Sequence, residues 1–178
     1  MEIYKRVKRE VKYKGTIVEM CQDTMEFPDG SLHQWDFIDH PGGAGVVAVL
    51  PDGKLLMVRQ YRNALERETL ELPAGGKSRG EDSRVCALRE LEEETGYRAG
   101  NCELLTLVCT NVALMNEQIG VYLCTDLIPA KQHLDEGEYL NVEAYTLDEL
   151  LSMIFSGKLQ DAKTVCGILA YKAKYHSA

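Results

Sequence analysis

The chain has no run of apolar residues long enough to cross a lipid bilayer, which takes about 20 residues of helix. Its first ten residues, MEIYKRVKRE, mix charges with apolar side chains and contain no apolar core of the kind that a signal peptide needs. The usual sequence signals for membrane insertion and secretion are therefore missing. We expect a cytoplasmic protein with no membrane partner.

An excess of positive charge is also missing. The chain has 20 Lys and Arg residues against 28 Asp and Glu residues, which gives a net charge of −8 at pH 7. Since a protein that binds nucleic acid through its charge needs a basic face, we expect no nucleic-acid partner. The same negative charge repels an anionic phosphate substrate unless metal ions or arginine side chains reverse the local field.

Closely spaced cysteines, the usual sign of a zinc site or a disulfide framework, are absent as well. The chain has six cysteines and no CxxC pair, and most of the cysteines lie in apolar surroundings. We interpret them as buried, reduced thiols of a cytosolic protein. They are Cys21, Cys86, Cys102, Cys109, Cys124 and Cys166.

The composition that remains is typical of a globular protein, with 45% hydrophobic and 27% charged residues and no internal repeat or linker. We expect a single domain over residues 1–178, in which residues 1–40 form N-terminal strands and residues 41–178 form the core.

The pattern of apolar residues and turn signals predicts strands in the middle of the chain, with helices inserted and at its end. Strands are expected over residues 3–13, 16–26, 31–39, 44–50, 54–61, 68–72, 104–112, 119–126 and 142–146, and helices over residues 83–95, 147–156 and 161–175. This order predicts an α/β fold, a mixed β-sheet sandwiched between α-helices, with an N-terminal antiparallel β-sheet extension.

The most informative stretch of the chain is GGKSRGEDSRVCALRELEEETGY, residues 75–97. Asp82 or Ser83 is suited to cap a helix start, and Gly96 is suited to the left-handed conformation that closes a helix. A helix is therefore expected between these signals.

Three carboxylates of this helix, Glu90, Glu93 and Glu94, stand at positions i, i+3 and i+4, which places them on one side. Like charges at these spacings repel, and the negative end of the helix dipole adds to the repulsion. A hard divalent cation turns the arrangement favourable, because carboxylate oxygens bind Mg²⁺, Mn²⁺ or Ca²⁺. The alternative interpretation is a solvated acidic face.

This stretch resembles the signature of the Nudix hydrolase family, G-x5-E-x7-R-E-U-x-E-E-x-G-U, in which U is a bulky aliphatic residue. Only the last position departs, with Tyr97 in place of an aliphatic residue. The positions in register are Gly75, Glu81, Arg89, Glu90, Leu91, Glu93, Glu94 and Gly96. The resemblance implies the Nudix fold, and it makes residues 41–178 a catalytic core.

The resemblance also implies a metal site. Glu90 and Glu94 are the expected principal ligands, Glu93 is an additional ligand or lies behind them, and the carbonyl of Ala74 completes the site. Mg²⁺ is the expected cofactor, with Mn²⁺ as the alternative.

A base outside the metal cluster is needed to take a proton from the attacking water. Glu117 matches a catalytic glutamate that relatives cleaving ADP-ribose carry in a loop at this point, and Glu93 is the fallback base. Arg89 is expected to pair with an acidic residue and to brace the site, together with Glu81. The alternatives are a solvated loop glutamate and an ordinary surface ion pair.

Three further side chains are candidates for binding the substrate. Arg59 and Arg62 lie near a strand end, where one of them can bind phosphate with bidentate geometry. Trp35 fits three roles: an interface anchor, a platform on which a base stacks, or a side chain that packs on its own sheet.

The stretches from residue 58 to 75, from 156 to 158 and from 161 to 164 resemble the ADP-ribose pyrophosphatase branch of the family, and the whole resemblance covers roughly residues 40–170. That branch usually has a proline in the loop after the signature, where this chain reads Asn111-Val112-Ala113. The implied activity is metal-dependent hydrolysis of the diphosphate bond of ADP-ribose or a related nucleoside diphosphate sugar. The alternatives are a nucleoside triphosphatase and an inactive, nucleotide-sensing domain. In the ADP-ribose-cleaving branch an N-terminal sheet helps form a dimer, so a homodimer is expected.

Overall fold

The computed structural model describes residues 3–176. These residues form two compact units. One contains the described residues up to Gly42 together with Cys109–Glu117, and the other contains Gly43–Val108 together with the described residues from Gln118 onward. The expectation of a single domain stays a prediction.

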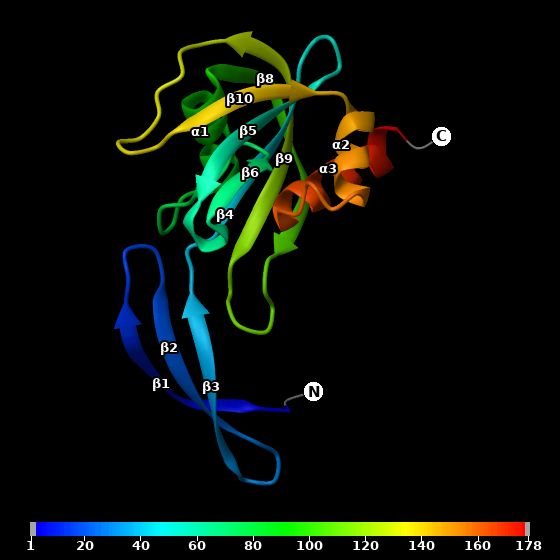
Figure 1. The fold of residues 1–178 in the computed structure, drawn as a ribbon. Coiled ribbons are helices and arrows are strands. Elements are labelled where there is room, and N and C mark those ends of the chain that lie inside the picture. The colour runs from blue at the N-terminus through cyan, green and yellow to red at the C-terminus, as the bar shows by residue number, and fades with distance from the viewer. Residues whose placement is uncertain (1–2, 177–178) are drawn as a thin grey trace. The chain divides into compact units, whose positions relative to one another are not determined.

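Ten strands, three α-helices and one 3₁₀-helix make up the described chain (Figure 1). In chain order they are β1 (Lys5–Lys14), β2 (Glu19–Glu26), β3 (Leu32–Asp39), β4 (Gly43–Val49), β5 (Leu55–Arg62), η1 (Asn63–Leu65), β6 (Arg67–Glu71), β7 (Ala74–Gly76), α1 (Ser83–Thr95), β8 (Tyr97–Cys109), β9 (Gln118–Pro129), β10 (Leu140–Tyr145), α2 (Leu147–Phe155) and α3 (Ala162–Tyr175). The three expected helices are confirmed. Strand β7 was not expected, and β8 and β9 are longer than the sequence pattern indicated.

The first unit contains a three-stranded antiparallel sheet in the order β1-β2-β3. Within the described strands of this sheet only Cys21 and Asp23 are buried. Arg9 donates to Asp23 from Nε and Nη2, at 2.6 and 2.5 Å, and its guanidinium carbon lies 3.9 Å from the centre of the Phe37 ring. An ion pair covered by an aromatic ring therefore occupies the place of an apolar core.

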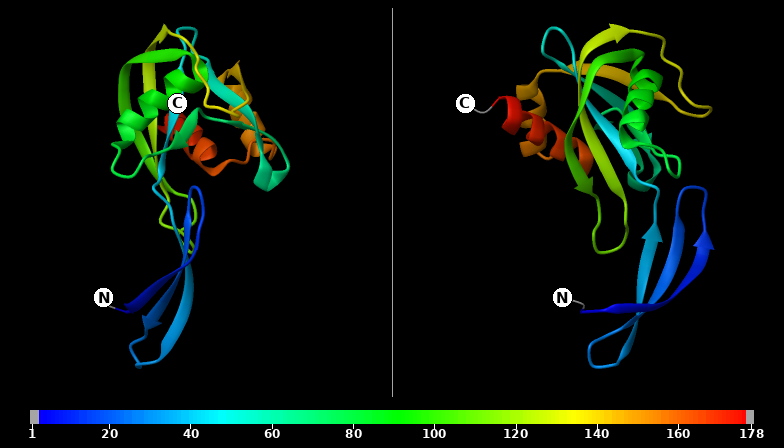
Figure 2. Two further views of the ribbon diagram at one scale, coloured as in Figure 1. Left: turned by 90° about the vertical axis from the view of Figure 1, so that its left-hand side faces the viewer. Right: turned by 180° about the vertical axis from the view of Figure 1, so that it is seen from behind.

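The second unit contains a seven-stranded sheet with the central order β10-β5-β4-β9-β8, to which β6 and β7 add at β5 and β4. Strands β4 and β9 pair in parallel and β4 pairs with β5 and β7 antiparallel, so the sheet is mixed. Helix α1 lies on one face and helices α2 and α3 on the other (Figure 2). The predicted mixed sheet between helices is confirmed.

Strand β4, with the sequence GAGVVAV, is the centre of this packing because it is buried on both faces. Val46 faces a cluster that includes Leu91 of α1, whereas Val47 faces a cluster that includes Ile168 of α3. The small residues at the start of β4 let β7 and α1 approach closely. Consequently, α1 and β7 are both held against a rigid strand.

The cysteines agree in part with the expectation of buried thiols. All six cysteines are free; four are buried, and Cys109 and Cys166 are exposed. Among the described residues no helix has the length and apolar character needed to span a membrane.

Candidate active site

Helix α1 begins and ends where local chemistry requires it. The Asp82 carboxylate accepts hydrogen bonds from the backbone N–H groups of Arg84 and Val85, at 3.0 and 3.1 Å, and so caps the helix. At the other end Gly96 has a φ of 71° and its N–H donates to the Glu92 carbonyl. With its two ends held in this way, the helix presents the side that carries Glu90 and Glu94 to β7 rather than to solvent.

Glu94 is 1% exposed, and its Oε2 accepts a hydrogen bond of 2.8 Å from the Ala74 N–H in β7. Glu90 lies against the next residue of β7. A Cβ atom added to Gly75 would stand 2.1 Å from the Glu90 carboxylate. Only glycine at position 75 allows this approach, so the backbone of β7 and two carboxylates converge on one place.

Without a bound cation, this environment disfavours the charged form of both carboxylates. Burial raises the pKa of Glu94 to about 8, and it raises the pKa of Glu90 against the opposing charge of Arg89. Carboxylate oxygens beside a strand backbone are the donors that a hard divalent cation prefers, and its charge would remove the cost of burying them. The residues therefore fit a divalent metal ion.

The third carboxylate of the predicted set is arranged differently. Arg89 Nη1 lies 2.7 Å from Glu90 Oε1 and 2.8 Å from Glu93 Oε2, so the guanidinium stands between these two side chains. Within residues 3–176 no three His, Cys, Asp or Glu side chains are grouped as a ready-made metal cage. Glu93 is held by Arg89 in this structure, and its role as a ligand stays a prediction.

Arg89 also joins the helix to the loop that follows β7. Its Nε lies 3.3 Å from Glu81 Oε1, and its Nη2 donates to the Gly76 carbonyl at 3.2 Å. Glu81 in turn accepts a hydrogen bond from the Ser78 N–H. The pairing of Arg89 with Glu81 that the sequence led us to expect is therefore present, and it ties the loop to α1.

A second charged network lies behind β7 and includes residues to which sequence reasoning assigned no role. Arg62 donates to both oxygens of Glu71, from Nε at 2.7 Å and from Nη2 at 2.6 Å. Lys163 of α3 donates to Glu71 Oε2 at 2.5 Å. Burial alone would raise the pKa of Glu71, but its bonds to Arg62 and Lys163 outweigh burial and lower it to about 2. The one sequence signal was a charged residue, Glu71, between two buried leucines.

Arg59 lies on the other face of β5 from Arg62, because residues three apart on a strand point to opposite sides. It donates to Glu143 from Nε at 2.6 Å and from Nη2 at 3.0 Å, and to the Tyr145 hydroxyl at 3.3 Å. Arg62 alone of the two shares the network of Glu71. The substrate-binding role of either arginine stays a prediction.

Glu117 belongs to the first unit. Its Oε2 accepts a hydrogen bond from the Thr110 hydroxyl, and its Oε1 lies 3.3 Å from Nδ1 of His40, a residue that sequence reasoning did not select. Asn116 holds the same loop, since its side chain accepts from the His40 N–H and donates to Asp39. The carboxylate is thus fixed by its neighbours, and its role as a base stays a prediction.

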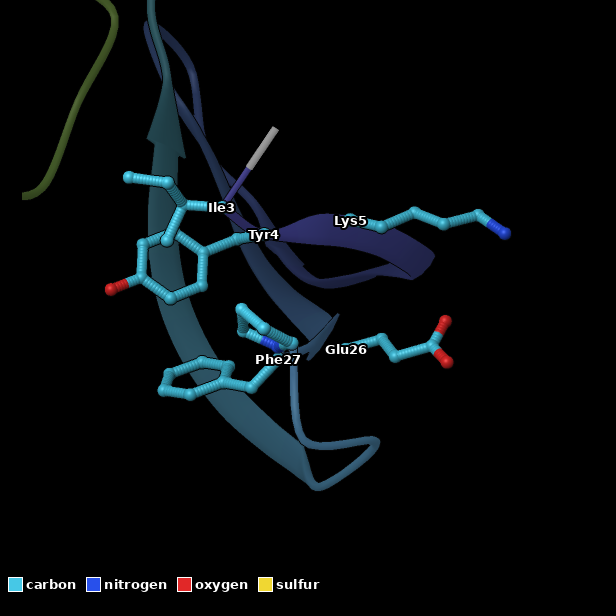
Figure 3. A pocket seen from close by; sticks show the side chains of 6 residues that line it. Ile3, Tyr4, Lys5, Glu26 and Phe27 are labelled. Atoms are coloured by element: carbon cyan, nitrogen blue, oxygen red, sulfur yellow. The ribbon is translucent and has the colours of Figure 1, made fainter. Parts of the chain in front are cut away.

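Trp35, also in the first unit, is 44% exposed and stands in a cluster of aromatic rings. The ring centre of Tyr4 lies 4.6 Å from that of Phe27 and 5.4 Å from that of Trp35. Next to the cluster is a cavity of about 630 Å³, at which the Tyr4 and Phe27 rings lie on one side while Lys5 and Glu26 point to the other (Figure 3). A planar ligand or a protein partner is suited to such a surface.

Comparison with known proteins agrees with this geometry. The family model described as NUDIX domain matches residues 39–166. An ADP-ribose pyrophosphatase of Bacillus subtilis is 36% identical over 92% of this chain and 90% of its own length, and a methanol dehydrogenase activator of Bacillus methanolicus is 38% identical with the same coverage. A crystal structure of an ADP compounds hydrolase superimposes with a TM-score of 0.84 at 18% identity, covering 98% of this chain and 97% of that one, which shows the shared fold.

Proposed function

Because this chain belongs to the Nudix family, we propose that it hydrolyses the diphosphate bond of ADP-ribose or a related nucleoside diphosphate sugar. The observation that carries the proposal is the pair of buried carboxylates, Glu90 and Glu94, packed against the backbone of Ala74 and Gly75. Nudix hydrolases generally use divalent metal ions, and two relatives that cover most of the chain are named ADP-ribose pyrophosphatases. With ADP-ribose the products are AMP and ribose 5-phosphate.

We assign Mg²⁺ to the site, with Mn²⁺ as the alternative. Glu90, Glu94 and the Ala74 carbonyl would hold the ion, and Glu93 would join them or support them through Arg89. A bound divalent ion supplies positive charge for the diphosphate oxygens and lowers the pKa of a water molecule.

Arg62 is the residue that we assign to a substrate phosphate. Its bonds to Glu71 use Nε and Nη2, which fixes the plane of the guanidinium, and we assign Nη1 to a phosphate oxygen. Its side chain is 41% exposed, whereas Glu71 is buried. A pre-oriented arginine loses little entropy when it binds an anion, which supports this assignment.

Glu117 is the residue that we assign as general base. The bond from Thr110 fixes Oε2, and we assign Oε1, which lies 3.3 Å from His40 Nδ1, to accept the proton of the attacking water. Glu93 is the alternative base, but it is already paired with Arg89. We assign Trp35 to the nucleobase, because its exposed ring offers a stacking surface.

We also propose that the chain is a homodimer that uses the sheet of the first unit. Val7, Val11, Tyr13 and Met20 on β1 and β2 are between 41% and 65% exposed, and the described residues of that unit include no helix to cover them. Burying exposed apolar side chains of this sheet against a second copy would remove them from water. Light scattering after size exclusion should give twice the chain mass, and the variant V11E should shift the protein toward the monomer.

The experiment that tests the activity is a panel of nucleotides incubated with Mg²⁺ or Mn²⁺, with the products separated by chromatography. ADP-ribose, ADP-glucose, a GDP-sugar and dGTP should be compared at equal concentration. Release of a nucleoside monophosphate and a sugar phosphate supports the proposal. Preferred cleavage of dGTP would instead assign the chain to nucleoside triphosphates.

A second candidate function comes from the relative named methanol dehydrogenase activator, which is 38% identical to this chain. A dehydrogenase of that type should be assayed with and without the protein. The variant E94Q separates the two activities, because activation that survives in this variant does not depend on hydrolysis.

A further inference from the structure

The start of α3 carries two polar side chains in places that stability alone does not explain. Lys163 is 8% exposed and Thr164 is fully buried. A lysine in the first turn of a helix opposes the helix dipole, and burying its ammonium group is costly. Both side chains are turned inward, toward the strand that leads to the candidate active site.

Lys163 connects α3 to the arginine assigned to the substrate. Its Nζ donates to Glu71 Oε2 at 2.5 Å and to Asp161 Oδ2 at 2.9 Å. The same oxygen of Glu71 accepts from Arg62 Nη2. Glu71 Oε1 also accepts a hydrogen bond from the Thr69 hydroxyl, at 2.6 Å. Without the lysine Glu71 would keep Thr69 and Arg62 but lose the bond from α3 to Oε2, so the carboxylate and the paired Arg62 guanidinium would shift together.

Thr164 connects α3 to the strand segment assigned to the metal. Its hydroxyl donates to Asp161 Oδ2 at 2.6 Å and accepts a hydrogen bond of 2.9 Å from the Leu72 N–H. Two residues later the Ala74 N–H donates to Glu94, and between them the Pro73 carbonyl accepts from the Val46 N–H. The segment that carries the Ala74 carbonyl is therefore held at three consecutive residues.

We propose that Lys163 and Thr164 are positioning residues of the active site, Lys163 for the substrate through Glu71 and Arg62, and Thr164 for the metal ion through Leu72. The inference rests on the proposed function, which assigns Arg62 and Ala74 their roles. It gives α3, which lies on the opposite face of the sheet from α1, a part in the site (Figure 2).

The test compares K163M and T164V with I168A, a control that removes a fully buried apolar side chain from the same helix. Ile168 packs in the cluster that includes Leu72 but makes none of the hydrogen bonds of Lys163 and Thr164, so I168A measures the effect of lost packing alone. Mn²⁺ binding is measured by calorimetry on the protein without substrate, and KM and kcat are measured at saturating metal. T164V should weaken Mn²⁺ binding by roughly tenfold or more while KM stays within twofold, since displaced supporting partners cost about 10- to 100-fold in metal affinity. The variant T164S should restore the binding.

K163M should show the opposite pattern. We expect KM to rise roughly tenfold or more, with Mn²⁺ affinity within twofold of wild type, because misplacing a substrate-binding group by about 1 Å costs up to about 100-fold. E71Q should raise KM in the same way, and the double variant K163M/E71Q should be no worse than either single variant, since both act through one contact.

The inference is overturned if I168A changes KM and Mn²⁺ affinity as much as K163M and T164V do at equal loss of melting temperature. It is also overturned if a folded T164V binds Mn²⁺ like wild type, or if the effects of K163M and E71Q on KM add. Failure of the proposed function looks different, because the wild-type protein would then cleave no diphosphate sugar. In that case Mn²⁺ binding to T164V, measured by calorimetry, still tests the role of Thr164. ADP-ribose binding to K163M, measured in the same way, still tests the role of Lys163.

Discussion

Gly75 is the position at which the smallest change should have the largest effect on the metal site. In G75A the new Cβ would stand 2.1 Å from the Glu90 carboxylate, whereas the shortest ordinary contact is 3.4 Å. The carboxylate would have to retreat by about 1.3 Å, the difference between these distances. Since Mg²⁺ binds oxygen within a narrow range near 2.0–2.1 Å, a retreat of this size breaks the bond that we assign to Glu90.

We expect G75A to weaken metal binding by roughly 10- to 100-fold, and to destabilise the fold by about 1–3 kcal/mol through overpacking. The assay is calorimetry with Mn²⁺, beside turnover of ADP-ribose over a range of metal concentrations. More metal should restore part of the turnover, because the other ligands remain.

The control is G76A, one residue further along the same strand. A Cβ atom at Gly76 meets nothing within 4 Å, and the Gly76 carbonyl that accepts from Arg89 is unchanged by the substitution. G76A should bind metal like wild type. Equal metal affinity in G75A and G76A would refute the placement of Glu90 against β7 and its assignment as a ligand.

Three other predictions follow from named contacts. E94Q should lower kcat by several orders of magnitude with little loss of stability, and near-normal turnover with Mg²⁺ would contradict the metal assignment. E117Q should lower kcat by roughly 100-fold or more with KM little changed, whereas an unchanged kcat would return the role of base to Glu93. Because the pKa of Glu71 is depressed to about 2, its stabilising effect is present above the unfolded-state value near 4.5 and is lost as the pH falls toward 2. Between pH 6 and pH 2 the free energy of unfolding, measured with urea, should fall by about 3 kcal/mol less in E71Q than in wild type.

The parts of the fold that could be predicted are those that short segments determine by themselves. Asp82 and Gly96 mark the ends of α1 through capping and left-handed geometry, and both lie where expected. Strand β7 escaped notice because its three residues, Ala74–Gly76, include two glycines and have no strand propensity. It exists because β4 pairs with it, and pairing between distant segments leaves no local signal.

The candidate site also has features that the sequence predicts and features that only the packing of the chain determines. The spacing of Glu90 and Glu94 predicts that they share a helix face, but it does not say that this face is buried against Gly75. The contact of Glu71 with Lys163 joins residues 92 positions apart, so it depends on how α3 packs on the sheet. Sequence reasoning therefore found the acidic helix and missed the network that supports it.

Glu71 and Glu94 of the second unit are both almost completely buried. Glu71 is paired with cationic side chains, whereas Glu94 is not. Glu71 is 2% exposed and has Arg62 and Lys163 as partners, which hold its pKa near 2 despite its burial. Glu94 is 1% exposed, and the bond from the Ala74 N–H does not offset burial, which raises its pKa to about 8. A chain selected only for stability would have given Glu94 a cation as well, or replaced it with an apolar residue. Among the described residues Glu94 has no ion-pair partner, and the charge of Lys163 does not offset its burial. This uncompensated burial is the strongest physical reason to place a divalent ion there.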